Sequence, residues 1–587
     1  MDSQQQGPIN WSDFIKQAKG SGASADFERV KARFSHMKKR TIIIGVVVLL
    51  AIIALAYWWF HPPINIHSID LWGFLILVLV VITFVLYVFR QIYKTGMGKR
   101  EASPKKEKLF TRLMIIPIAI VIIGAGGWVA SQSFFPGNAE KFSTILETTD
   151  GDFATDVPEV NYNEIPFIDK ASAELLGNRT MGTMADYVSQ FEISPLYSQI
   201  NYKGQPVRVS PLNYADFFKW WANRDGGIPA YVIVNMTTQD TEIVRLENPI
   251  RYSDSDPFFY NVDRYVQLSY PFYMFDEKSF EINEDGEPYW VYPVQKRTIG
   301  LFGGTTIQRV VLCNASTGEC QDLAVDEVPQ WVDRVYPAEL LIQQYNWSGA
   351  LSGGWINSWL GQNGVKQTTP GTDGKNGFNY IAQDDDVWVY SGVTSATADN
   401  SIIGCVMINQ RTAESKFYAV AGATEESAMH SAEGQVQHLK YDATFPLLLN
   451  VDGQPTYFMA LKDDAGLVKM YAMVDIQRYQ NVAVGDTLAA TEKSYELLLV
   501  NQGINTGGTP ATANPGEGTT SGTIASISPV VIDGNSHYYL ILDGQQAIFD
   551  CPVASVVDVV RYKVGDVIVL HHGALEGNVV VVDAIGE

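Results

Sequence analysis

The stretch Ile200-Asn-Tyr-Lys-Gly204-Gln-Pro206 (INYKGQP) recurs in the middle of the chain, and this repeat decides how that part folds. Related copies read INEDGEP at residues 282–288 and LNVDGQP at residues 449–455. Glycine at the fifth position supplies the positive φ that a tight hairpin needs, and proline begins the next strand. The first two glycines lie 82 residues apart and the next two 167, close to twice that. A degenerate copy is therefore predicted near residue 370, where PGTDGKNGFNYIAQ (370–383) offers a similar turn.

A second repeated element is a strand, a polar turn and another strand. It reads YVIVNMTTQDTEIVRL from Tyr231, RVVLCNASTGECQDL from Arg309, GCVMINQRTAESKFYAV from Gly404 and YAMVDIQRYQNVAV from Tyr471. After each of the last two copies a similar phrase opens a helix, Ala421-Gly-Ala-Thr-Glu-Glu-Ser-Ala and Val484-Gly-Asp-Thr-Leu-Ala-Ala, in which Thr or Asp is an N-cap signal; the final helix is predicted over Thr487–Val500. Residues 131–502 are therefore predicted to form a multi-domain, β-rich α+β region, in which strands and a helix repeat about four times.

One of these hairpins carries a family resemblance. Val310–Glu319 (VVLCNASTGE) resembles the closing hairpin of PepSY domains, with the pattern V-x-V-D-A-x-T-G-E. The third copy departs from the pattern, with Thr412-Ala413-Glu414 in place of Thr-Gly-Glu. PepSY domains are small extracytoplasmic α+β modules. The resemblance implies a binding or regulatory module rather than a catalyst.

The C-terminal part divides into a linker and a small domain. Residues 503–522 (GINTGGTPATANPGEGTTSG) are rich in Gly, Thr and Pro and are predicted to be a flexible linker. Residues 523–587 show about five short strands with turns between them, typical of a small β-barrel that resembles an OB-fold. Arg561 and Lys563 are its basic residues against eight acids, which disfavours a nucleic-acid partner.

The N-terminal part differs sharply from the rest in charge and hydropathy. Residues 1–130 hold 16 Lys and Arg against 7 Asp and Glu, whereas the whole chain holds 42 against 64. Uncharged runs at residues 41–60, 71–90 (uncharged to Phe89) and 113–130 have the length of membrane spans. A three-helix transmembrane anchor over residues 41–130 is predicted, after a cytoplasmic segment at 1–40, with the lipid bilayer as a partner. Positive charges before the first run and between the last two predict a multi-pass plasma-membrane protein, with its N-terminus in the cytoplasm and its C-terminal ectodomain outside.

Two groups of residues are predicted to make specific contacts. In the third run, Gly126 with Ala130 and Gly127 with Ser131 form small-xxx-small pairs that permit close helix packing, against this chain or another subunit. Cys313 and Cys320 flank the turn NASTGE, so a disulfide is possible if their strands pair directly. Buried free thiols are the alternative.

No catalytic, cofactor-binding or metal-binding residue is predicted. The chain contains none of the GxSxG, HExxH, P-loop or dinucleotide motifs in context. The pairs His571-His572 and His61 with His67 lack a third ligand nearby and are interpreted as surface or core residues. Asp384–Asp386 and Ser253–Asp256 are interpreted as solvated turns.

These features favour a non-enzymatic, membrane-anchored binding or scaffold protein at the cell surface, which associates with a protein partner or with itself. An accessory subunit of a membrane transport or secretion complex is one alternative. An envelope hydrolase is another, and it requires a cleft lined by carboxylates.

Overall fold

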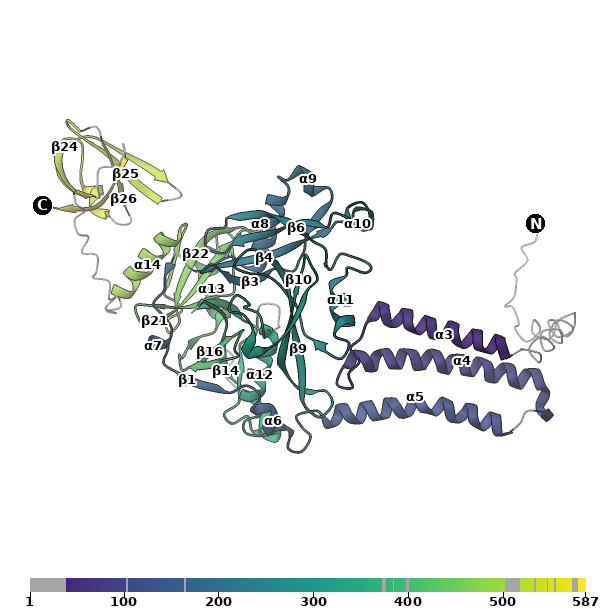
Figure 1. The fold of residues 1–587 in the computed structure, drawn as a ribbon. Coiled ribbons are helices and arrows are strands. Elements are labelled where there is room, and N and C mark those ends of the chain that lie inside the picture. Colours follow the sequence, from purple (N-terminus) through teal and green to yellow (C-terminus); the bar gives the residue numbers. More distant parts are fainter. Residues whose placement is uncertain are drawn as a thin grey trace, which may run out of the picture.

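The computed structural model places four β-sheet units in the middle of the chain (Figure 1). It describes residues 39–586 apart from 102–103, 163–164, 372–375, 384, 397–400, 502–517, 533–534, 546, 554–555 and 573–578. The predicted segment 1–40 lies almost entirely outside the described residues, and so do residues 503–517 of the predicted linker.

Each unit begins with a helix and continues into an antiparallel sheet. Unit 1 consists of α8 (Lys170–Met181), β2 (Phe191–Ile193), β3 (Ser198–Tyr202), β4 (Gln205–Tyr214), β5 (Ile228–Asn235) and β6 (Thr241–Ile250). Unit 2 consists of α11 (Val262–Ser269), β7 (Met274–Phe275), β8 (Ser279–Ile282), β9 (Pro288–Ile299), β10 (Gly303–Asn314) and β11 (Cys320–Ala324). In both units the first two strands pair with successive parts of the third, and the remaining strands follow as hairpins.

Units 3 and 4 repeat this order. Unit 3 consists of α12 (Ala338–Leu351), β12 (Lys366–Thr368), β13 (Asn379–Gln383), β14 (Asp386–Ser395), β16 (Gly404–Asn409) and β17 (Ser415–Tyr418), with β1 (Thr148–Gly151) added in parallel to β17. Unit 4 consists of α13 (Glu425–Gln435), β19 (Asp442–Ala443), β20 (Leu447–Val451), β21 (Gln454–Lys462), β22 (Val468–Asp475) and β23 (Val482–Gly485). Helix α14 (Leu488–Asn501) packs on β22 and β23.

The repeated turns lie between the second and third strands of each sheet. Gly204, Gly286 and Gly453 all have positive φ, as their sequence pattern predicts. The copy in unit 3 differs from its predicted place near residue 370. It joins β13 to β14, and Asp385 takes the positive φ of 62°. Asp tolerates this conformation, so the turn carries no glycine to mark it.

The closing hairpin of each unit is stabilised in the same way. The side-chain oxygen of Asn235, Asn314, Asn409 or Asp475 accepts hydrogen bonds from the backbone N–H groups two and three residues later. This is an Asx turn, which fixes the direction in which the chain leaves the first strand of the hairpin. The four units are therefore related in local detail as well as in strand order.

Both faces of the central strands are buried, because neighbouring sheets share cores. In β9, Trp290 and Tyr292 belong to a core shared by units 1, 2 and 4, whereas Val291 faces a core shared with unit 3. A further core lies between units 3 and 4 and contains Trp388 and Tyr457. Each of the four sheets therefore shares a core with at least one other sheet. This explains why the strands read as nearly continuous apolar runs.

Helices α3 (Lys39–Phe60), α4 (Ile69–Glu101) and α5 (Pro104–Ala130) coincide with the three apolar runs and lie side by side (Figure 1). Within the described part of the chain, however, no helix is long and apolar enough to cross a membrane. On this finding the predicted three-helix transmembrane anchor is wrong, together with the multi-pass plasma-membrane localisation. The fold class is corrected to a β-rich protein with several sheets.

The C-terminal strands form a closed barrel. It consists of β24 (Gly518–Ile532), β25 (Asn535–Leu542), β26 (Ile548–Pro552), β27 (Val567–His572) and β28 (Val579–Gly586). The first strand begins at Gly518, inside the predicted linker. Leu540, Phe549 and Leu570 fill the interior. The resemblance to an OB-fold stays a prediction.

Candidate binding site

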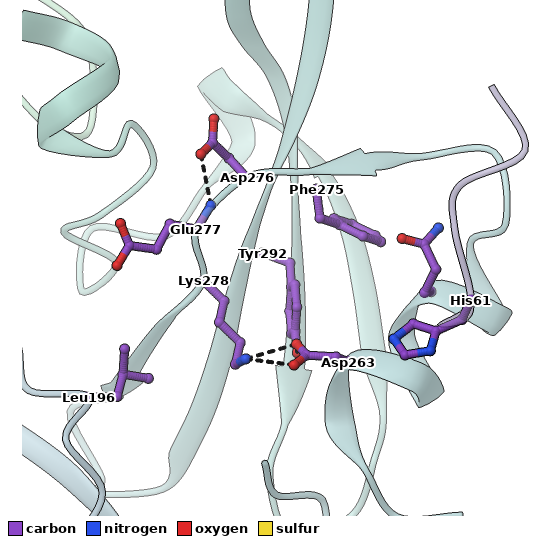
Figure 2. Close-up of a pocket in the computed structure, with 9 residues that line it drawn as sticks. His61, Leu196, Asp263, Phe275, Asp276, Glu277, Lys278 and Tyr292 are labelled. Atoms are coloured by element: carbon purple, nitrogen blue, oxygen red, sulfur yellow. Dashed lines mark hydrogen bonds and ion pairs between the residues drawn. The ribbon is translucent and has the colours of Figure 1, made fainter. Parts of the chain in front are cut away.

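A cavity of about 290 Å³ lies where the loop after α3 meets unit 2 (Figure 2). Its residues come from the α3–α4 loop, the β2–β3 connection, α11, β7, the β7–β8 connection and β9. They are His61, Leu196, Asp263, Gln267, Phe275, Asp276, Glu277, Lys278 and Tyr292.

The local structure explains how these side chains are positioned. Asn261 caps α11 by accepting a hydrogen bond from the Arg264 N–H, so Asp263 lies in the first turn, where a helix favours an acid. Gln267 follows one turn later on the same side. Strands β7 and β8 both pair with β9, and the residues between them form one wall of the cavity. Tyr292 projects from the middle of β9.

Lys278 is the centre of an ion-pair network in this cavity. Its Nζ lies 2.8 and 2.9 Å from the two carboxylate oxygens of Asp263 and 2.8 Å from Oδ1 of Asp254. The Tyr292 hydroxyl donates to Asp263 Oδ1 at 2.7 Å. One ammonium group therefore holds two carboxylates that come from separate segments.

Burial and charge set the protonation of the network. Burial lowers the pKa of Lys278, but Asp263 and Asp254 outweigh it and the net pKa is raised. Burial raises the pKa of Asp254, and Lys278 opposes that shift. Burial also raises the pKa of Tyr292 well above its ordinary value. Lys278 and Tyr292 thus keep their protons at neutral pH, which suits binding better than proton abstraction.

The other polar groups of the cavity are also held in place. Asp276 accepts from the Glu277 N–H at 2.8 Å and from Gln295 Nε2 at 2.7 Å. Gln267 donates to the backbone oxygen of Tyr273 at 3.0 Å. Burial lowers the pKa of His61, whose Nδ1 lies 3.0 Å from the Trp59 oxygen.

The loop Ser253–Asp256 supports this site, whereas its sequence predicts a solvated turn. Asp256 is buried and accepts hydrogen bonds from Trp220 Nε1 at 2.6 Å and from the N–H groups of Phe258 and Tyr260 at 2.8 and 3.2 Å. Asp254, two residues earlier, joins the Lys278 network. These acids directly precede an aromatic run and a helix, and this position is the sequence signal that could have indicated a buried role.

An exposed group of aromatic residues adjoins the cavity at the start of α11. We call it the aromatic surface, and it consists of Phe217, Phe218 and Trp221 on α10 (Phe217–Asn223) and of Phe258, Phe259 and Tyr260. Phe218 is 78% exposed and Phe259 76%. Phe217 contacts Phe258 with ring centroids 6.5 Å apart, which joins its two segments.

Neighbouring polar and charged groups fix the segment α10, which carries part of the aromatic surface. Asp216 caps α10 by accepting from the N–H groups of Phe218 and Lys219. Arg224 lies over the Trp221 ring at 3.7 Å. A second exposed group contains Phe134, Trp355 and Trp359, of which the two Trp rings stack at 6.2 Å. Groups of large exposed aromatic side chains on ordered segments are unusual on a protein surface that contacts only water.

Two residues of the predicted small-residue face contact a β-hairpin, and, among the described residues, no contact of this face with another helix is seen. A side chain at Gly127 would collide with Leu301, and Ser131 Oγ accepts hydrogen bonds from the Leu301 and Phe302 N–H groups at 2.8 and 3.0 Å. These two residues therefore receive the tip of the β9–β10 hairpin. The position that meets another helix is Gly124, which faces Trp72 of α4, and Gly126 has open space beside it. The Ala130 backbone oxygen accepts from Asn138 Nδ2 at 2.9 Å.

The remaining predicted residues have local partners. Cys313 and Cys320 lie directly opposite each other on β10 and β11, and both are free thiols, so the disulfide stays a prediction. His572 is buried, contacts Thr520 at 2.7 Å, and its ring packs on Phe549. His67 contacts the Leu301 backbone oxygen. Among the described residues, no group of three or more His, Cys, Asp or Glu side chains is arranged to hold a metal ion.

Comparisons with known proteins add little to this geometry. No family model matches the chain, and no curated protein matches it. Two solved structures, a variant of Synechocystis apocarotenoid oxygenase and a chimera of that enzyme with RPE65, are each 9% identical to it with a TM-score of 0.14. The matches cover 68% and 67% of this chain and 66% and 65% of theirs, so the chain spans just under two thirds of their length. At this TM-score the likeness carries no argument.

Proposed function

We propose that this chain is a non-enzymatic binding or scaffold protein, which associates with a protein partner or with a second copy of itself. The observation that carries the proposal is the aromatic surface. Its members are held outward by Asp216 and Asp256, through hydrogen bonds from backbone N–H groups and the Trp220 indole. Exposed aromatic residues of this kind provide the central contacts of protein interfaces.

The cavity beside the aromatic surface supports the same function. In this cavity, Lys278 forms ion pairs with two carboxylates, and the Tyr292 hydroxyl keeps its proton. The arrangement offers a firm, polar recess next to apolar anchors, which is typical of a recognition surface. The PepSY-like hairpin of unit 2 favours a binding module too, and the few basic residues of the barrel favour a partner other than nucleic acid.

The proposal is tested by removing two exposed anchors. We would compare the full chain with the double variant Phe218→Ser, Phe259→Ser by analytical ultracentrifugation, and by the stoichiometry of proteins retained on purification from the native source. The matched control is Val557→Ser, Val560→Ser, which changes two exposed apolar residues of the barrel. Loss of two interface aromatics is expected to raise the dissociation constant at least about tenfold, whereas the control leaves it unchanged.

Two results would overturn the proposal. The first is a full chain that sediments as a monomer at every concentration and retains no stoichiometric partner. The second is a Phe218, Phe259 double variant that associates as tightly as the unaltered chain.

A further inference from the structure

Cys313 and Cys320 face each other across the closing hairpin of unit 2. Their strands pair in register, and the hairpin loop is closed by the Asn314 N–H, which donates to the Glu319 oxygen at 2.9 Å. Because Asn314 and Glu319 form a hydrogen-bonded pair, the next pair along the ladder, Cys313 with Cys320, is a non-hydrogen-bonded one. Side chains approach most closely at such pairs, so this position suits a bond between the two sulfur atoms.

The repeat provides an internal comparison for this position. In the other units, the pairs at the same place are Val234 with Thr241, Ile408 with Ser415, and Val474 with Val482. Three of the four units therefore close the same hairpin without any sulfur. The fold does not require cysteine here, yet unit 2 has cysteine on both strands.

The two thiols differ in access. Cys313 is fully buried, next to Trp290 on the neighbouring strand, whereas Cys320 is half-buried. The neighbouring Cys313 side chain lowers the pKa of Cys320, although burial opposes this shift. The same contact, followed by burial, raises the pKa of Cys313. The backbone oxygens of Gly318 and Asn314 lie 3.5 and 4.0 Å from the Cys320 and Cys313 sulfurs, respectively.

We propose that Cys320 and Cys313 form a redox-active dithiol that reacts with a small disulfide of the glutathione type. Cys320, as the thiolate, attacks one sulfur of the small disulfide, forms a mixed disulfide and releases the first thiolate. The Cys313 thiol then loses its proton and attacks Cys320, which forms the Cys313–Cys320 bond and releases the second thiolate. The protein dithiol is oxidised by two electrons, the small disulfide is reduced to two thiols, and the proton passes to the leaving thiolate or to water.

The hairpin connects this site to α11 and the loop before it. The Tyr265 hydroxyl donates to the Gly318 oxygen at 2.9 Å, and the Tyr252 ring packs against Gly318. Tyr252 and Tyr265 in turn contact each other at 4.4 Å. A covalent link at residues 313 and 320 closes the hairpin beneath these rings, and slower amide exchange over Tyr252–Ser269 is the expected consequence.

The remaining cysteines serve as internal controls. Cys405 and Cys551 are fully buried, and burial raises the pKa of both thiols, to about 12 for Cys551. They are therefore expected to react slowly with any disulfide reagent. Suitable variants come from the chain itself: Cys313→Val and Cys320→Thr place at each position the residue that unit 1 has there.

The experiment treats the reduced full chain with glutathione disulfide and follows it by intact mass and non-reducing peptide mapping. The unaltered chain is expected to lose two hydrogen atoms and to yield a Cys313–Cys320 cross-linked peptide. Cys313→Val is expected to stop as a stable single glutathione adduct on Cys320, and Cys320→Thr to react at least about tenfold more slowly, because Cys313 is buried. Circular dichroism verifies that both variants are folded. A folded, unaltered chain that forms no cross-link, or a Cys320→Thr variant that reacts as fast as the unaltered chain, would overturn the proposal.

Discussion

Replacing Lys278 with methionine is expected to destabilise the protein by about 2–3 kcal/mol at neutral pH. Methionine keeps the length and apolar character of the lysine stem but removes the ammonium group. Asp254 and Asp263 then face each other without a cation between them. Breaking a buried ion pair on one side costs about 3–5 kcal/mol. A smaller loss of about 2–3 kcal/mol is expected here because the side chains of Lys278, Asp254 and Asp263 are 15%, 30% and 43% exposed, so water screens part of the repulsion.

The pH dependence of this variant has a definite sign. Burial raises the pKa of Asp254 even with Lys278 present, and loss of the cation raises it further. The folded variant then binds more protons than the unfolded chain once the pH exceeds the ordinary carboxyl pKa of about 4. Its stability therefore rises as the pH falls from 7 toward about 4, and the difference from the unaltered chain narrows.

The assay is urea unfolding followed by tryptophan fluorescence, for which Trp290 is a reporter 5.5 Å from Lys278. The control is Lys170→Met, at the exposed first position of α8, which is expected to change stability by less than about 0.5 kcal/mol. Adding Asp254→Asn to Lys278→Met removes one of the two facing charges and is expected to recover at least about 1 kcal/mol. A loss below about 1 kcal/mol, or no recovery in the double variant, would refute the Lys278 ion-pair network.

Three further outcomes are expected. Asp256→Ala removes the acceptor of three hydrogen bonds and should lower the free energy of unfolding by about 3 kcal/mol and weaken association, measured by urea unfolding and ultracentrifugation. Asn314→Ala removes one Asx turn and should cost about 1–2 kcal/mol in the same unfolding assay. Asn409→Ala removes an Asx turn and also the hydrogen bond from Asn409 Nδ2 to the buried Asp386 carboxylate at 2.7 Å, so it should cost more; an equal or smaller loss would argue against these contacts. Burial and the neighbouring Glu281 raise the pKa of Asp333. Asp333→Asn should therefore preserve or increase the stability of the protein at pH 7. Any gain should vanish near pH 4, and thermal melting at several pH values would measure it.

Local signals in the sequence were sufficient for the strands, turns and caps. Positive φ at Gly204 and Gly453, and the cap at Thr424, follow from the preferences of single residues. The turn of unit 3 was placed too early because Asp385 adopts the left-handed conformation without a glycine. Burial on both faces of β9 and β14 was not predicted, since a continuous apolar run does not show which cores its alternate residues enter.

The candidate site could not be predicted because its residues are far apart in the sequence and meet only in the folded protein. Its residues come from segments between His61 and Tyr292 and are brought together by the packing of α11 and the α3–α4 loop on β9. The Asp254–Lys278 contact joins two loops whose spacing matches no motif. An acid in a polar loop is usually solvated, so Ser253–Asp256 gave no local sign that Asp254 and Asp256 would be drawn inward.

Small residues posed a related problem in the apolar helices. A Gly or Ser predicts that something approaches the helix backbone closely, but the identity of the neighbour depends on the tertiary structure. At Gly127 and Ser131 the neighbour is the tip of the β9–β10 hairpin. Ser131 Oγ accepts hydrogen bonds from two backbone N–H groups of this tip. The same β10 leads from that tip to Cys313 at its other end. Unit 2 therefore links α5, the cavity, the loop that carries the aromatic surface and the thiol pair through one sheet. Units 1, 3 and 4 have Val234 with Thr241, Ile408 with Ser415, and Val474 with Val482 at the place of the cysteine pair, so the thiol pair is specific to unit 2 among the four sheets.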